Sequence, residues 1–134
     1  MLCLGGCGWY AARQFANIQT AADEGSTKGS LSSLRSALQG YYGDHEGKFP
    51  TDLAILVPKY LKYMPMTITA SHGRVRGDIF YLSGKDFREG RFTDTGGWAY
   101  VNTPGDPEFG TLVVNCTHND YSIHPEVRKP WTTF

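Results

Sequence analysis

The sequence carries no net charge, because its 134 residues include 13 basic and 13 acidic side chains. A chain without a basic excess generates no field that would draw it to nucleic acid or to an anionic membrane. Catalytic signatures are missing as well, since there is no GxSxG, HExxH, GxGxxG or phosphate-binding P-loop pattern. The sequence therefore disfavours nucleic-acid binding, and we expect no enzymatic activity.

Cysteine is scarce, and Cys3, Cys7 and Cys116 form no CxxC pair. A disulfide from Cys3 or Cys7 to Cys116 stays open in an oxidising compartment, although the first two lie at the far end of an expected helix. Cys116 and His118 would share one face of a strand, but the sequence shows no second pair to complete a tetrahedral metal site. We therefore expect no metal ligands and a buried free thiol at Cys116.

A long hydrophobic run is also missing. Residues 1–12, MLCLGGCGWYAA, are apolar but shorter than the roughly 20 residues that span a bilayer. They contain no basic segment of the kind that opens a signal peptide. Residues 4–7 are similar to a lipoprotein cleavage site without its apolar stretch. Whether Met1 is the biological start stays open, and the chain is compatible with an internal start of a longer protein.

The clearest pattern lies in residues 19–42, where apolar side chains recur at helical spacing. At about 100° per residue, five of them fall within an arc of roughly 100°. They are Leu31, Leu34, Leu38, Tyr41 and Tyr42. The turn GDHEGKFP at 43–50, with two glycines and a proline, ends the pattern. We predict a helix whose apolar stripe packs into the core of a globular head.

A second stripe lies nearly opposite on the same helical wheel. It consists of Ala11, Phe15, Ile18, Ala22, Gly25 and Gly29. A helix that buries one side in its first half and the other side in its second half does not serve a single core. We expect the first half to pack against neighbouring helices. The alternative is that residues 1–20 form a frayed tail, because two glycines and the polar run 24–29 weaken the helix.

Strand signals follow a short helix that we expect Thr51 to cap. Three aromatic or β-branched runs, 77–82, 97–102 and 110–116, predict an antiparallel meander, with Trp98 and Tyr100 in the core. The C-terminal tail should insert Trp131 into the head. The expected fold is α+β: a long N-terminal α-helix packed on a small three- to four-stranded antiparallel sheet. The helical stalk covers residues 1–29 and the head residues 30–134.

Several segments, in this order along the chain, resemble the heads of type IV pilins and of the major pseudopilins of type II secretion. The similarity covers roughly residues 9–122. It is carried by ADEGSTKG with Leu31 at 22–31, LRSAL at 34–38, YYGD at 41–44, GKFPTDL at 47–53, PKYL at 58–61, GGWAY at 96–100 and GTLVVN at 110–115. The start of the helix departs from the family, which begins with a basic leader and an unbroken apolar stretch.

The resemblance implies a structural subunit of an extracellular or periplasmic filament on a bacterial surface. Such a subunit polymerises with itself through helix packing, with other pilins or secretion machinery as further partners. Major pseudopilins often hold calcium in the loop beside their last strands. Here that region carries the acidic residues Asp86, Glu89, Asp94, Asp106 and Glu108. They lack a DxDxDG-like spacing, so we expect no cofactor, with calcium as the alternative.

Two other function classes stay open. A surface-anchored monomeric binding module would keep the pilin-like head and grip a ligand with its tail or with the 85–95 loop. A small hydrolase would need a nucleophile beside a base, and we expect His45, His72, His118 and His124 to be exposed loop residues instead. Asn115, Cys116 and Thr117 form a glycosylation triplet. The sequence does not distinguish a pilus from a pseudopilus, or assign an adhesive or conductive role.

Overall fold

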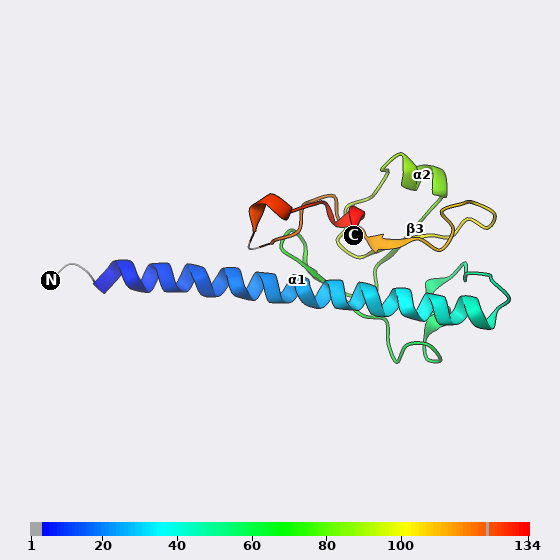
Figure 1. Ribbon diagram of the computed structural model, residues 1–134, viewed down its shortest axis with the longest axis horizontal. Coiled ribbons are helices and arrows are strands. Elements are labelled where there is room, and N and C mark those ends of the chain that lie inside the picture. Colours follow the sequence, from blue (N-terminus) through cyan, green and yellow to red (C-terminus); the bar gives the residue numbers. More distant parts are fainter. Residues whose placement is uncertain (1–3, 123) are drawn as a thin grey trace.

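The computed structural model describes residues 4–122 and 124–134, and consists of one long helix with a head built around its C-terminal half (Figure 1). The helix α1 spans Leu4–Asp44. It runs through Gly25 and Gly29 without a break, so the alternative of a frayed tail is wrong for the described part of residues 1–20. Within 4–122 and 124–134, no helix combines the length and the apolar composition needed to cross a membrane.

The expected stop signal ends α1. Glu46 and Gly47 adopt left-handed backbone conformations with φ of 56° and 77°, and the Gly47 N–H donates to the Tyr42 carbonyl at 3.0 Å. The short helix that follows is a 3₁₀ turn, η1 (Leu53–Leu56). Its cap is Asp52 and not Thr51, because the Asp52 carboxylate lies next to the first helical residue and accepts from the Ala54 N–H at 3.0 Å.

The strands form two separate sheets. A hairpin pairs β1 (Thr67–Thr69) with β2 (Gly73–Val75), and a three-stranded sheet has the order β3 (Ile79–Leu82), β4 (Trp98–Val101), β5 (Leu112–Val114). Strands β4 and β5 are antiparallel, whereas β3 and β4 are parallel. The fold is α+β as expected, but the prediction of one antiparallel meander is wrong.

The parallel pair follows from the segment between β3 and β4, which we expected to be a plain loop. Two consecutive parallel strands need a crossover connection of about a dozen residues or more. Residues 83–97 supply it, with a short helix α2 (Gly84–Arg88) capped by the Ser83 hydroxyl. Phe87 and Phe92 from this crossover pack on the side of the sheet that faces away from α1. Both faces of β4 and β5 are therefore buried, which explains their continuous apolar sequences.

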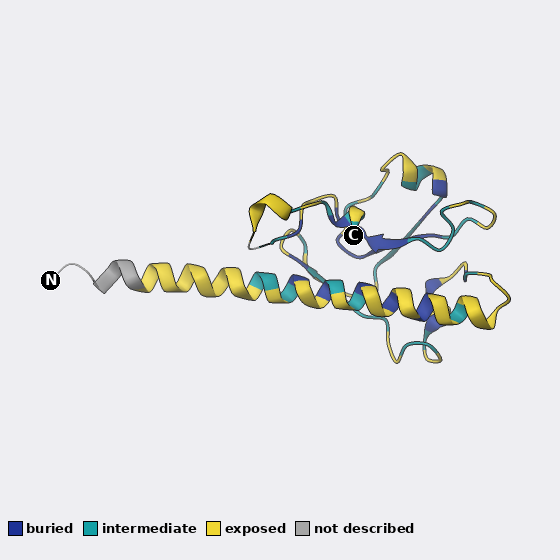
Figure 2. Cartoon of the chain, viewed as in Figure 1, coloured by how far each residue is buried: buried dark blue, intermediate teal, exposed yellow. Residues whose placement is uncertain are grey.

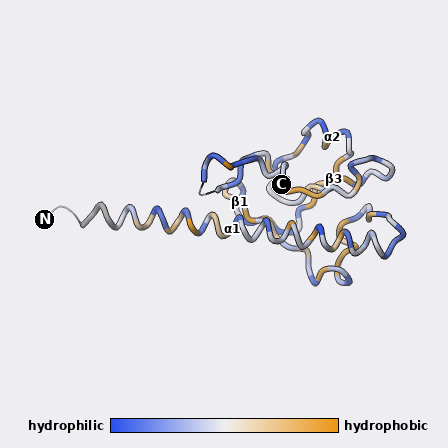
Figure 3. Tube along the Cα trace, viewed as in Figure 1, coloured by the Kyte–Doolittle hydropathy of each residue, from blue (hydrophilic) through white to orange (hydrophobic). Residues whose placement is uncertain are grey.

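The main core lies between α1 and the three-stranded sheet (Figure 2). Leu31, Leu34 and Leu38 are at most 3% exposed and pack with Trp98 and Tyr100. Hydropathy along the trace shows the same division, with apolar segments where the head meets α1 (Figure 3). The tail, through η2 (Pro125–Val127) and η3 (Trp131–Thr133), buries Trp131 completely, as predicted.

The two tyrosines at the end of the stripe differ from the leucines. Tyr41 is half-buried and stacks on His45 with ring centroids 3.7 Å apart. Tyr42 is 39% exposed, so its assignment to the core is wrong. It lies in the last turn of α1, where its ring contacts Phe49 at the edge of the head.

Candidate functional site

The first half of α1 forms a surface that we call the stalk surface, residues 8–19, all of which are exposed. Its large apolar side chains Trp9, Tyr10, Phe15 and Ile18 are 61–74% exposed. All four residues expected on the assembly side are exposed: Ala11, Phe15, Ile18 and Ala22. Trp9 and Tyr10 were not part of that stripe. At about 100° per residue they lie on other sides of the helix, so the first turns of the stalk surface expose large apolar side chains outside the stripe as well, whereas Arg13 and Asn17 lie on the side away from the stripe.

A group of polar side chains joins α1 to the head one to two turns before Leu31. The Glu24 carboxylate is 2% exposed and accepts the Ala70 N–H at 3.0 Å and the Tyr121 N–H. The Thr27 hydroxyl donates to the Ile68 carbonyl at 2.6 Å. Contact between helix and head therefore begins on the N-terminal side of residue 29.

Lys28 extends the same junction, with its Nζ 2.7 Å from Oδ2 of Asp120. The periodicity of apolar residues does not indicate this junction, because the side chains that form it are polar. On the same helical wheel, Glu24 and Thr27 lie in the arc of the leucine stripe, and that position was the signal that they face the head. Buried polar side chains need hydrogen-bond partners, so polar residues within that arc would have indicated donors or acceptors on the head.

The acidic loop residues considered for calcium are spread over the head. Asp86 and Glu89 both pair with Arg91, at 3.4 Å and 2.6 Å. Asp106 pairs with Arg88 at 2.9 Å and also accepts the Glu108 N–H. In the part of the chain that the structure describes, the one convergence of three or more metal-ligating side chains includes Asp94 and none of the other four.

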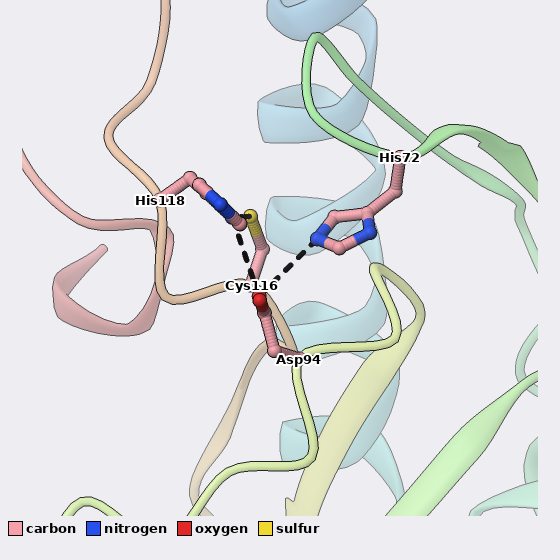
Figure 4. Close-up of side chains that lie close together, drawn as sticks. All are labelled: His72, Asp94, Cys116 and His118. Atoms are coloured by element: carbon pink, nitrogen blue, oxygen red, sulfur yellow. Dashed lines mark hydrogen bonds and ion pairs between the residues drawn. The ribbon is translucent and has the colours of Figure 1, made fainter.

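That convergence consists of His72, Asp94, Cys116 and His118, which we call the His/Asp/Cys cluster (Figure 4). His72 lies in the β1–β2 turn, Asp94 in the crossover before β4, and Cys116 and His118 beyond β5. Oδ1 of Asp94 is 3.2 Å from Nε2 of His72 and 3.4 Å from Nδ1 of His118. Sγ of Cys116 is 3.8 Å from the same nitrogen of His118.

The surrounding backbone fixes the cluster. The Asn115 side chain is fully buried, accepts the Asp94 N–H at 3.1 Å and donates to the hydroxyls of Thr93 and Thr95. Gly96 has φ of +84°, and a Cβ there would lie 2.4 Å from Cβ of His72. The position therefore requires glycine for two reasons, the left-handed backbone and the close approach of His72.

Asp94 and Cys116 differ in how readily they ionise. The Thr117 N–H, which donates to Asp94, and the two nearby imidazoles hold the pKa of the Asp94 carboxyl below its usual value. Burial raises the pKa of the Cys116 thiol, so the thiol keeps its proton at neutral pH. The cluster thus presents one carboxylate, two imidazoles and a thiol.

The structure brings His72 and Asp94, from two other loops, next to Cys116 and His118, a convergence that the sequence did not indicate. His72 is half-buried and not an exposed loop residue. The Cys-x-His spacing was the one local signal, since the other two residues come from distant positions. Cys3, and the side chain of Cys7, lie outside the described part, so pairing of either with Cys116 is not described.

The chain matches no protein-family model, no curated protein and no solved structure. Inferences about function therefore depend on the arrangement of the chain's own residues.

Proposed function

We propose that this protein is a structural subunit of a type IV pilus-like or secretion-pseudopilus filament, and that it polymerises through its N-terminal helices. The observation that carries the proposal is the stalk surface. Large apolar side chains that recur along one side of a helix are normally covered by another helix or another molecule. Trp9, Tyr10, Phe15 and Ile18 are instead exposed to water in the isolated chain.

The occupant that fits the stalk surface is another copy of the same chain. Small residues alternate with the large ones, and Ala11, Ala12, Ala16 and Ala22 are exposed along the same helix. Small side chains let helix backbones approach one another closely. Arg13 is the one charged residue in segment 8–22, so little charge has to be desolvated when such helices associate.

A shallow groove continues the assembly side of α1 along the head. Ser26, Gly29, Ser30 and Ser33 line one wall, and the loop at 61–65 lines the other, with Tyr63 69% exposed at its rim. The stalk of one subunit packed in the groove of the next would be a heterologous contact. Heterologous contacts that do not close into a ring generate helical filaments.

Negative-stain electron microscopy and sedimentation velocity of the purified full chain test this proposal. We expect ordered fibres from the wild type. The double variant Phe15→Asp/Ile18→Asp should sediment as a monomer without fibres, because each carboxylate would have to be buried in the helix interface. Far-ultraviolet circular dichroism should show that the head still folds.

The matched control introduces the same two charges on the head. The double variant Ile55→Asp/Val127→Asp replaces apolar side chains that are 54% and 60% exposed, and it should still form fibres. Monodisperse wild-type particles at high protein concentration would contradict the proposal and favour the monomeric binding module. Fibres that persist in Phe15→Asp/Ile18→Asp would contradict assembly through the stalk.

A further inference from the structure

The His/Asp/Cys cluster has the composition and spacing of a metal site. We propose that His72, Asp94, Cys116 and His118 bind one zinc ion as a four-coordinate structural site that ties three loops of the head together. This inference does not depend on filament formation, because all four ligands lie on the head.

The spacing of the four side chains fits tetrahedral zinc. Bonds of about 2.0–2.3 Å to nitrogen, oxygen and sulfur place neighbouring ligand atoms roughly 3.3–3.8 Å apart. Three of the separations here are 3.2 Å, 3.4 Å and 3.8 Å, and all four atoms lie within 4.8 Å of one another. Side-chain adjustments of about an ångström at the wider pairs would complete the shell.

The donor set selects the kind of metal. Calcium and magnesium take oxygen ligands, and calcium needs six to eight of them, whereas this cluster offers one carboxylate beside a thiol and two imidazoles. Zinc binds sulfur, nitrogen and carboxylate oxygen together. Four protein ligands leave no open position for water or substrate, so the site is structural and not catalytic.

Charge balance favours the same ion. On binding, the Cys116 thiol releases its proton to solvent and both imidazoles bind in their neutral form. The thiolate and the Asp94 carboxylate then offset the two positive charges of zinc, so the occupied site is neutral. His118 has a 53% exposed side chain, against 17% for His72, so the ion would enter from the His118 side.

The outer contacts hold the ligands in place before the metal arrives. The Thr117 N–H donates to Oδ1 of Asp94 at 2.9 Å, and Asn115 fixes the backbone of Asp94. Groups that orient metal ligands in this way commonly change metal affinity by about 10- to 100-fold. The ligands also lie close in sequence to Ala70 and Tyr121, which bind Glu24, so zinc would stiffen the junction with α1.

Cobalt spectroscopy on the full chain tests the site. In the variant Cys3→Ser/Cys7→Ser, Cys116 is the remaining thiol of the three in the sequence. Adding Co²⁺ to this metal-free protein should give one equivalent of binding, the visible bands of a tetrahedral ion and a thiolate charge-transfer band. Zn²⁺ should then displace Co²⁺.

Further variants assign the ligands. Cys116→Ser should abolish the charge-transfer band, and His72→Gln or Asp94→Asn should lower zinc affinity by at least about 10-fold, since loss of a ligand should cost no less than loss of a group that orients one. The matched control is His124→Gln, because the His124 imidazole lies beside Glu126 and outside the cluster. This variant should leave the charge-transfer band and the zinc affinity unchanged. Zinc should also raise the midpoint of thermal unfolding of the starting protein and not that of His72→Gln.

The site would be overturned by a weak octahedral cobalt spectrum without a charge-transfer band. Zinc affinity unchanged in both His72→Gln and Asp94→Asn would overturn it as well. Cys116→Ser can be interpreted only if circular dichroism shows that it folds. If it does not fold, the zinc affinities of His72→Gln and Asp94→Asn, at more exposed positions, decide whether the site binds zinc.

Discussion

At the residue scale, Glu24 joins three distant segments through one carboxylate. Its two oxygens accept the N–H of Ala70 in the β1–β2 turn and the N–H of Tyr121 in the C-terminal segment, while its backbone belongs to α1. The side chain is 2% exposed, so water does not replace these bonds. A buried carboxylate is tolerated here because backbone donors satisfy it.

Replacing this carboxylate should therefore destabilise the protein. Glu24→Ala leaves two N–H groups without their acceptor, and we expect the free energy of unfolding to fall by about 2–4 kcal/mol. Urea denaturation at pH 7 measures the change. The control Asp23→Ala removes a neighbouring carboxylate whose hydrogen bond is to Gln19 on the same helix, and should change the value by less than about 0.5 kcal/mol. Equal effects of the two variants would contradict this role of Glu24.

At the element scale, α1 serves two environments. From Glu24 to Leu38 one side of the helix faces the head, and residues 8–19 face solvent on every side (Figure 2). The helix gains stability from the head only in its second half. Residues 8–19 are all exposed, so packing against the head does not stabilise this part of the helix.

A substitution at Leu34 would measure how much the leucine stripe of α1 contributes to the stability of the head. Leu34 is 0% exposed and lies at the centre of the buried leucines of α1. Leu34→Ala should lower the free energy of unfolding by about 2–5 kcal/mol, because it removes buried methyl groups and leaves a cavity. Ser33→Ala on the exposed side is the matched control and should have a small effect. A loss below about 1 kcal/mol for Leu34→Ala would contradict the packing described here.

The crossover between β3 and β4 is the second element-scale feature. It carries α2 and the two rings of Phe87 and Phe92, which pack at right angles to each other with centroids 5.9 Å apart. These rings close the face of the sheet that α1 cannot reach. The head is thus layered, with α1 on one side of the sheet and a short, aromatic-rich connection on the other.

At the scale of the whole molecule, ion pairs between distant segments link stability to pH. Burial alone would raise the pKa of Asp120, but hydrogen bonds from the Lys28 ammonium and the Lys129 N–H outweigh it and hold that pKa below its ordinary 3.8. The Glu108 N–H and the Arg88 guanidinium lower the pKa of Asp106 in the same direction. Each carboxylate stabilises the folded protein fully at pH values above its pKa in the unfolded chain. This stabilisation is lost as the pH falls through its lower pKa in the folded protein.

The free energy of unfolding should therefore stay nearly level from pH 7 to about pH 5 and fall below about pH 4. Chemical denaturation across this range measures it. Asp120→Asn should be clearly less stable than the wild type at pH 7, with a smaller difference at pH 3, where the wild-type carboxyl also becomes protonated. A difference that does not change with pH would contradict the pairing of Lys28 with Asp120.

The sequence by itself determined the features that depend on local periodicity. The spacing of Leu31, Leu34 and Leu38 fixed which side of α1 is buried, and the glycine and proline turn fixed where the helix ends. The three apolar runs located β3, β4 and β5, because β-branched and aromatic side chains favour buried strands wherever the chain places them. Trp131 was recognisable as an isolated large ring that needs burial.

Only the tertiary structure decided how these pieces meet. The direction of β3 against β4 depends on a crossover that packs by two phenylalanines, and no strand sequence encodes it. The partners of Glu24 come from two other parts of the chain. His72 and Asp94 reach Cys116 and His118 only because the β1–β2 turn, the crossover and the end of β5 converge. Local sequence carries propensity, whereas contacts between distant segments arise only when the whole chain packs.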